Sequence, residues 1–172
     1  MDDMSPSEAV TMLLEQYGDE LYRFVRFTVG NKSDADDLIQ DVFLRVIQGW
    51  KRFNHRSNPK TWLWAIAKNC IKEFYRKQKR HSVVTTLNDM ELSDHHAVDA
   101  LTEVMIAETL QRIPIPQREA FIERIVNERT TSETAQVLGW SESKVRTTLH
   151  RAIASIRKIY KKGDERSAGT RY

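Results

Sequence analysis

The 172-residue sequence is poor in cysteine, proline and glycine, with one, four and six residues respectively. The single cysteine, Cys70, excludes an intrachain disulfide, and its place among apolar residues indicates a small buried side chain rather than a reactive thiol. No uncharged apolar run approaches the roughly 20 residues that a membrane-spanning helix needs. The acidic, polar start MDDMSPSEAV lacks the features of a signal peptide, so we expect a cytoplasmic protein without membrane insertion.

Motifs of enzyme chemistry are scarce as well. The chain has no glycine-rich phosphate loop and no pattern of an activated nucleophile. The one group of metal-ligand side chains comprises His95 and His96 with Asp94 and Asp99, and adjacent histidines in a polar segment rarely converge on one metal ion. A metal-dependent enzyme is therefore a weak alternative, and we expect no catalytic residue, no metal and no cofactor.

Charge is abundant but unevenly distributed. The net charge is only +3, and the 40% of hydrophobic and 30% of charged residues fit a soluble helical protein. Residues 68–80 hold six Lys or Arg against one Glu, residues 82–111 hold six acidic residues and no Lys or Arg, and residues 144–162 hold seven Lys or Arg and no acid. Blocks of this length suggest separate surfaces with separate partners.

Helical periodicity dominates the chain, and we find no strand pattern. Ser33 and Asp36 are predicted to cap one helix, and Asn58 and Pro59 to begin another. The predicted helices cover 7–16, 19–29, 33–50, 60–80, 100–112, 116–128, 131–138 and 142–161. The fold class is therefore all-α, with two small helical domains (1–80 and 100–162), a flexible acidic linker (81–99) and a flexible tail (163–172).

The helix predicted over residues 60–80, KTWLWAIAKNCIKEFYRKQKR, has aromatic and basic residues in addition to a complete core-facing stripe. An apolar stripe is complete at Leu63, Ile66, Ala67, Cys70, Ile71 and Phe74. Outside the stripe lie Trp62, Trp64 and Tyr75 together with six cations. Aromatic rings and cations are what single-stranded nucleic acid requires, although packing of both tryptophans on neighbouring helices is an equal alternative from this helix alone.

The segment TTSETAQVLGWSESKVRTTLHRAIASIRK, residues 130–158, fits a helix-turn-helix. Ala135 is small where two helices cross, Gly139 suits a turn that needs positive φ, and Val145 would join the second helix to the first. The residues predicted to reach a DNA groove are Ser141, Glu142, Ser143, Lys144, Arg146, Thr147, His150 and Arg151. The alternative is a helical hairpin whose basic face is only solvated.

Four stretches in this order resemble the extracytoplasmic-function (group 4) sigma factors of bacterial RNA polymerase, which keep only the second and fourth sigma domains. They are DADDLIQDVFLRV (34–46), KTWLWAIAKN (60–69), IPIPQREAFIERI (113–125) and VRTTLHRAIASIRK (145–158). The resemblance implies promoter-specific transcription initiation in a stress or envelope response. It also implies as partners the β′ clamp and β flap of core RNA polymerase and promoter DNA, and it leaves open an anti-sigma partner, membrane-anchored or soluble.

The resemblance also implies roles for individual residues. Polymerase binding falls to Asp37, Gln40, Asp41 and Leu44. Recognition and melting of the −10 element fall to Asn54, His55, Arg56, Asn58, Lys60, Trp62, Lys68, Lys72 and Arg76, and recognition of the −35 element falls to the eight residues of the helix-turn-helix given above. Leu63 stands where primary sigma factors have a second tryptophan. A stand-alone helix-turn-helix regulator remains the alternative, but it leaves the aromatic and basic helix at 60–80 unexplained.

Overall fold

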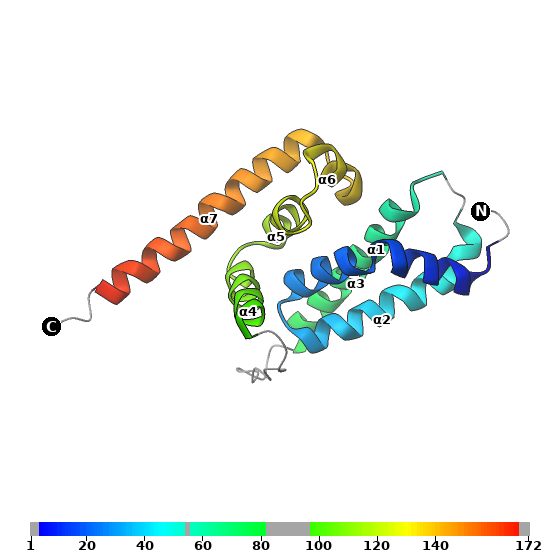
Figure 1. The fold of residues 1–172 in the computed structure, drawn as a ribbon, viewed down its shortest axis with the longest axis horizontal. Helices are drawn as coiled ribbons and strands as arrows, with labels where there is room; N and C mark the ends of the chain where they lie inside the picture. Colours follow the sequence, from blue (N-terminus) through cyan, green and yellow to red (C-terminus); the bar gives the residue numbers. More distant parts are fainter. Residues whose placement is uncertain (1–3, 54–55, 82–96, 169–172) are drawn as a thin grey trace.

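The computed structural model describes residues 4–53, 56–81 and 97–168, and these contain seven α-helices and no strand (Figure 1). The predicted all-α class is confirmed. The helices are α1 (Pro6–Val29), α2 (Lys32–Gly49), α3 (Pro59–His81), α4 (Ala97–Gln111), α5 (Ile115–Phe121), α6 (Thr131–Leu138) and α7 (Glu142–Ala168), with a 3₁₀ turn η1 (Trp50–Arg52) and a π-helical turn η2 (Ile122–Val126). We call α1–α3 the N-terminal unit and α4–α7 the C-terminal unit.

Helix α1 is one continuous helix, so the prediction of two helices over 7–16 and 19–29 is wrong. Gly18, which falls between the two predicted ranges, lies in the helix interior, where glycine costs only about 1 kcal/mol relative to alanine. Leu13 and Leu21, both fully buried, outweigh that cost. The helix ends at Gly30, whose φ of 85° is the left-handed conformation of a helix C-cap.

Helix α2 begins earlier than predicted. Asn31, and not Ser33, is the N-cap, and its side-chain oxygen accepts a hydrogen bond from the backbone N–H of Asp34 at 3.2 Å. One apolar face of this helix is buried, at Ala35, Leu38, Val42, Phe43 and Val46. Ile47, next to Val46, is 44% exposed.

Helix α3 has the predicted extent and core stripe, with Leu63, Ala67, Cys70 and Ile71 buried. Asn58 accepts a hydrogen bond from the backbone N–H of Lys60 at 2.8 Å, which confirms the predicted start.

The C-terminal unit is built around α7, which packs against α5 and α6. The single helix predicted over 116–128 is wrong, because α5 ends at Phe121 and continues as the wider turn η2. Helix α7 extends to Ala168, beyond the predicted end at residue 161, so Gly163 is helical and the predicted flexible tail is too long.

The two units share one hydrophobic core. Helix α4 packs against α1, and α6 packs against α3 (Figure 1). One cluster of buried side chains contains Leu21 and Leu63 from the N-terminal unit and Leu110, Ile122 and Leu138 from the C-terminal unit. The predicted linker falls mainly on residues 82–96, which lie outside the described residues. Among the described helices, none has the length and apolar character needed to cross a bilayer.

Candidate nucleic-acid interface

The helix-turn-helix of the C-terminal unit has the predicted geometry. Gly139 adopts φ 66° and ψ 39°, which is the left-handed conformation that glycine takes readily. Its backbone N–H bonds to the carbonyls of Ala135 and Gln136 and closes the end of α6. Val145 at the start of α7 is fully buried, and Ala135 of α6 is 8% exposed. Burial of Val145 therefore fixes α7 to α6, as the spacing of these residues predicted.

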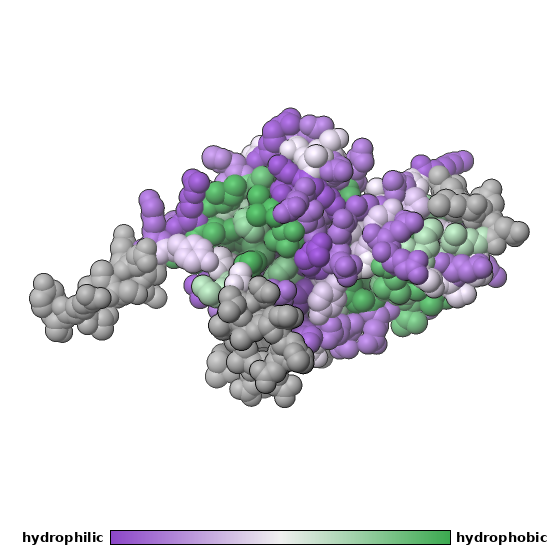
Figure 2. Space-filling model, viewed as in Figure 1, coloured by the Kyte–Doolittle hydropathy of each residue, from purple (hydrophilic) through white to green (hydrophobic). Residues whose placement is uncertain are grey.

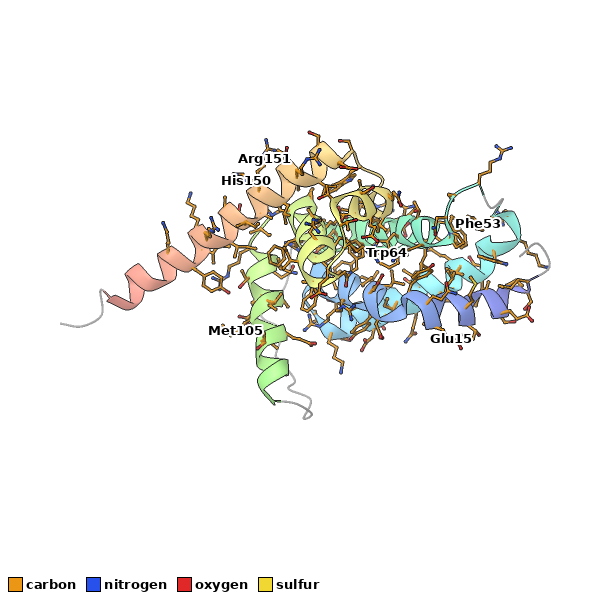
Figure 3. The ribbon with its side chains drawn as sticks, turned by 45° about the horizontal axis from the view of Figure 1, so that its top comes forward. Glu15, Phe53, Trp64, Met105, His150 and Arg151 are labelled. Atoms are coloured by element: carbon orange, nitrogen blue, oxygen red, sulfur yellow. The ribbon has the colours of Figure 1, made fainter. Side chains whose placement is uncertain are left out.

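All eight residues predicted to reach a DNA groove are exposed in the structure. His150 and Arg151 lie on the outer side of α7, away from the N-terminal unit (Figure 3). The Ser141 hydroxyl accepts a hydrogen bond from the Lys144 backbone N–H at 3.2 Å, so this serine caps α7. Glu142 pairs with Arg146 at 3.0 Å one turn later. An exposed pair of this kind contributes little to stability, so it does not fix the Arg146 side chain in this position.

The residues predicted to contact the −10 element differ in how far the structure exposes them to solvent. Arg56, Asn58, Lys72 and Arg76 are exposed. Asn54 and His55 lie outside the described residues, in the loop that precedes α3. Because the Asn58 side chain already accepts the Lys60 N–H, its hydrogen-bonding capacity toward a base is reduced.

Trp62 belongs to an aromatic cluster at the start of α3. Its ring stacks on Phe53 with centroids 4.7 Å apart and an interplanar angle of 29°, and the Trp50 ring lies 5.9 Å away. A Cβ atom at Gly49 would come within 3.1 Å of the Trp62 ring, so the glycine makes room for it. Trp62 remains partly exposed. Sequence reasoning missed the supporting roles of Trp50 and Phe53, although both aromatics flank the loop before α3.

Trp64 is not an outward aromatic: of the two alternatives that the sequence left open, packing against neighbouring helices holds for this residue. The side chain is fully buried where the two units meet (Figure 3), and its indole N–H donates to Glu123 Oε1 at 2.9 Å. The Arg129 guanidinium lies 4.4 Å from the centroid of the Trp64 ring, a cation–π contact. The periodicity of α3 could not reveal this, because the C-terminal unit covers a second face of the helix.

Tyr75 is likewise turned inward rather than toward solvent. Its hydroxyl donates to the Thr28 carbonyl at 2.8 Å and accepts a hydrogen bond from Arg118 Nη1 at 2.8 Å. Burial raises the pKa of Tyr75, and the neighbouring Arg118 partly opposes the shift. Arg118 is only 8% exposed and also donates to the Thr28 carbonyl, at 2.8 Å. These groups join the two units and cannot stack on a base.

Two of the predicted DNA-binding lysines are engaged inside the protein. Lys60 forms a salt bridge with Glu20 at 3.0 Å. Lys68 donates to the backbone carbonyl of Leu138 in the C-terminal unit at 2.6 Å, and burial lowers the pKa of Lys68. Neither ammonium group is directed freely to solvent in this arrangement.

The residues predicted to bind polymerase lie together on the exposed side of α2. Asp37, Gln40, Asp41 and Leu44 are all exposed, and Leu44 is 55% exposed. Apolar side chains gather over α2 in the space-filling view (Figure 2). Next to this face, Arg45 of α2 makes two hydrogen bonds to the Glu73 carboxylate of α3, at 3.0 and 2.6 Å. This pair raises the pKa of Arg45 and lowers that of Glu73 through hydrogen bonding.

No cluster of three or more His, Cys, Asp or Glu side chains suited to a metal ion occurs in the part of the chain that the structure describes. His95 and His96 lie outside that part.

Comparison with known proteins gives two family matches and close relatives. Residues 13–81 match the family described as Sigma-70 region 2, and residues 103–156 match Sigma-70, region 4. The ECF RNA polymerase sigma factor SigX of Bacillus subtilis (strain 168) is 34% identical over 161 residues, which cover 88% of this chain and 83% of SigX.

Two solved structures share the fold. The sigma factor RpoE, in a complex with the anti-sigma factor NepR from Bartonella quintana, aligns with a TM-score of 0.70 at 20% identity, covering 88% of this chain and 96% of that one. CnrH, in a complex with the cytosolic domain of CnrY, aligns with a TM-score of 0.66 at 21% identity, covering 91% and 94%.

Proposed function

The chain belongs to the sigma-70 family of RNA polymerase sigma factors. From this membership we propose a role in transcription initiation for each of its exposed surfaces. It is a sigma factor of the extracytoplasmic-function type, which associates with core RNA polymerase and directs transcription from specific promoters. The stand-alone regulator is not favoured, because the region 2 match covers the N-terminal unit as well.

The α7 face that begins at Ser141 reads the −35 element. The observation that carries this assignment is the exposure of all eight predicted residues on a helix that Val145 and Gly139 fix in a helix-turn-helix. Lys144 and Arg146 lie in the first turns, where side chains reach base edges in the major groove. Their charges are available because their contacts with Trp140 and Glu142 are surface contacts.

The start of α3 and the loop before it recognise the −10 element. The partly exposed Trp62, supported by Phe53, is the aromatic platform, and it would stack on an unpaired base at the edge of the melted region. Lys72 and Arg76 are exposed one and two turns beyond Lys68 and would contact the phosphates. With one platform where primary sigma factors have two tryptophans, melting should be weaker and promoter choice stricter.

The exposed side of α2 docks on the polymerase. Asp37, Gln40 and Asp41 present polar groups and Leu44 an apolar one, and none of them contributes to the core. An anti-sigma partner is a further proposal, supported by the complex of the sigma factor RpoE with the anti-sigma factor NepR, in which the sigma chain shares this fold.

The test is co-purification with core RNA polymerase. The double variant Gln40→Ala, Asp41→Lys should lose binding while its circular dichroism stays unchanged, because both side chains lie off the core. Glu15→Lys, an exposed acid on α1, is the matched control and should bind normally. Binding of the double variant at the wild-type level would refute the α2 face, and failure of the wild-type protein to bind would refute the function itself. A gel shift of duplex DNA without polymerase would favour the stand-alone regulator.

A further inference from the structure

Trp140 lies in the turn of the helix-turn-helix, directly before the serine that caps α7. Its backbone N–H donates to the Ala135 carbonyl at 2.9 Å, and the Gly139 N–H donates to the Gln136 carbonyl at 3.3 Å. These two bonds form a Schellman motif, which satisfies carbonyl groups at the end of α6. The backbone of Trp140 is therefore fixed with respect to α6.

The indole ring of Trp140 is held by packing as well. The side chain is partly buried and packs against the hydrophobic core. An apolar residue directly before an N-cap commonly packs on the fourth residue of the helix, and in α7 that residue is the fully buried Val145. A tryptophan side chain has only two χ angles, so little conformational entropy is lost when it is fixed. The ring is therefore a stationary surface at the start of α7.

Lys144 places its ammonium group over this ring. Lys144 Nζ lies 4.1 Å from the centroid of the Trp140 ring, well inside the roughly 6 Å limit of a cation–π contact. The Lys144 backbone is held too, because its N–H donates to the Ser141 hydroxyl at 3.2 Å. The ring covers one side of the ammonium group, which has three N–H donors. Since the lysine is exposed, its outward donors remain available to DNA.

The contact between Trp140 and Lys144 lies within the C-terminal unit and singles out one cation of α7. Arg146, the other cation in the first turns of α7, pairs with Glu142 instead. Lys68 of α3 lies farther from the Trp140 ring, at 5.6 Å, and its ammonium group donates to a backbone carbonyl. The ring therefore orders Lys144 and leaves Arg146 to its own partner.

We propose that Trp140 is a positioning residue for recognition of the −35 element. A free lysine side chain has many rotamers, and ordering it on binding costs free energy. The ring removes part of that cost for one direction of the Lys144 ammonium group, and so determines which base-pair edge Lys144 reads. Trp140 acts through Lys144 and does not contact the bases itself. This inference rests on the proposed function, because it deepens the −35 role of α7.

The experiment is a double-mutant cycle on the full chain bound to core polymerase. Wild type, Trp140→Leu, Lys144→Ala and the double variant are compared by affinity across a −35 substitution library. Leucine keeps an apolar side chain before the N-cap, and Trp140→Phe keeps a ring face as the conservative variant. Selectivity is a ratio of affinities within one preparation, so a smaller folded fraction in one variant does not change it.

Trp140→Leu should reduce discrimination about two- to fivefold at the −35 positions where Lys144→Ala reduces it, and should have no further effect in the double variant. Trp140→Phe should retain most of the discrimination. Positions at which Arg146→Ala relaxes selectivity are the internal control and should stay unchanged in Trp140→Leu. An equal loss at all positions, additive effects in the double variant, or wild-type selectivity in Lys144→Ala would overturn the inference.

Nuclear magnetic resonance of the free full chain tests the contact without polymerase. The face of an aromatic ring shifts nearby protons upfield, so the ε-methylene protons of Lys144 should lie upfield of their position in Trp140→Leu. Identical positions in the two proteins would overturn the ordering of Lys144. A wild-type holoenzyme without any −35 preference would refute the proposed function of α7 instead, and the spectrum of the free chain would still decide whether Trp140 holds Lys144.

Discussion

Replacing Trp62 by alanine should reduce open-complex formation while the protein stays folded. The ring is partly exposed, and its support consists of the stacked Phe53 and the more distant Trp50. Aromatic pairs of this kind contribute about 0.5–1.5 kcal/mol each. We therefore expect a loss of about 1–3 kcal/mol of unfolding free energy, below the 3–5 kcal/mol typical for removal of a fully buried aromatic. Loss of a stacked base costs about 1–3 kcal/mol in addition, which lowers the open-complex equilibrium roughly 5- to 150-fold.

Trp64→Phe is the control, two residues along the same helix. Trp64 is fully buried, and phenylalanine cannot donate to Glu123 Oε1. Glu123 keeps Arg129 and Asn127 as partners, but loss of a hydrogen bond to a buried carboxylate costs about 1.5–3 kcal/mol, and the smaller ring leaves a cavity. This variant should melt at a distinctly lower temperature, yet the molecules that remain folded should still open promoters.

The measurements are a thermal melt of each variant and permanganate reactivity of thymines in the promoter complex. One kcal/mol corresponds to a shift of roughly 2–4 °C in Tm for a chain of this size. A melting temperature that falls as far for Trp62→Ala as for Trp64→Phe, with permanganate reactivity retained, would show that Trp62 is a packing residue and would remove it from the −10 site.

Two further predictions concern α7 and α1. Alanine at Lys144 or Arg146 should cost about 1–3 kcal/mol of binding free energy and relax selectivity at single −35 positions, whereas alanine at Lys158 or Lys161 should weaken binding to all sequences alike. Both effects are measured as holoenzyme affinity across a −35 substitution library at two salt concentrations. Indistinguishable profiles would refute the proposed helix register. Burial and the hydrogen bond to Asp36 raise the pKa of Tyr22 from 10.0 to about 12, so the stabilising contribution of Tyr22 is complete below pH 10 and is lost as the pH rises toward 12. A phenolate absorbance titration of the wild type, compared with that of Tyr22→Phe, checks this. A wild-type curve in which all tyrosines titrate near pH 10 would contradict it.

Features that depend on local spacing were predictable from the sequence. The positions of Ala135, Gly139 and Val145 predicted the helix-turn-helix, because a short turn between two helices restricts which side chains fit. The stripe through Leu63 and Ala67 predicted α3 and its core face. Both predictions concern contacts within one unit.

Contacts between the units were not predictable. Trp64 and Tyr75 fall outside the apolar stripe of α3, and both are covered by α1 and the C-terminal unit together. Trp64 lies against Phe24 and Glu123, and Tyr75 bonds to Thr28 and Arg118. Glu123 and Arg129 looked like ordinary surface charges, because the sequence does not indicate that they pair inside an interface. The helix break predicted near Gly18 was wrong for a related reason. Helix α1 continues because burial of the neighbouring side chains stabilises it by more than one glycine destabilises it.

The single core described above has a consequence for how the chain unfolds. Cooperative units are set by which side chains are packed together, and here the buried cluster runs from Leu21 through Trp64 to Ile122 and Leu138 without a boundary. Two sequence segments that match separate families should therefore melt in one calorimetric transition in the free protein. Once the units are held apart, each must rely on its own smaller core, and the single transition should divide into two.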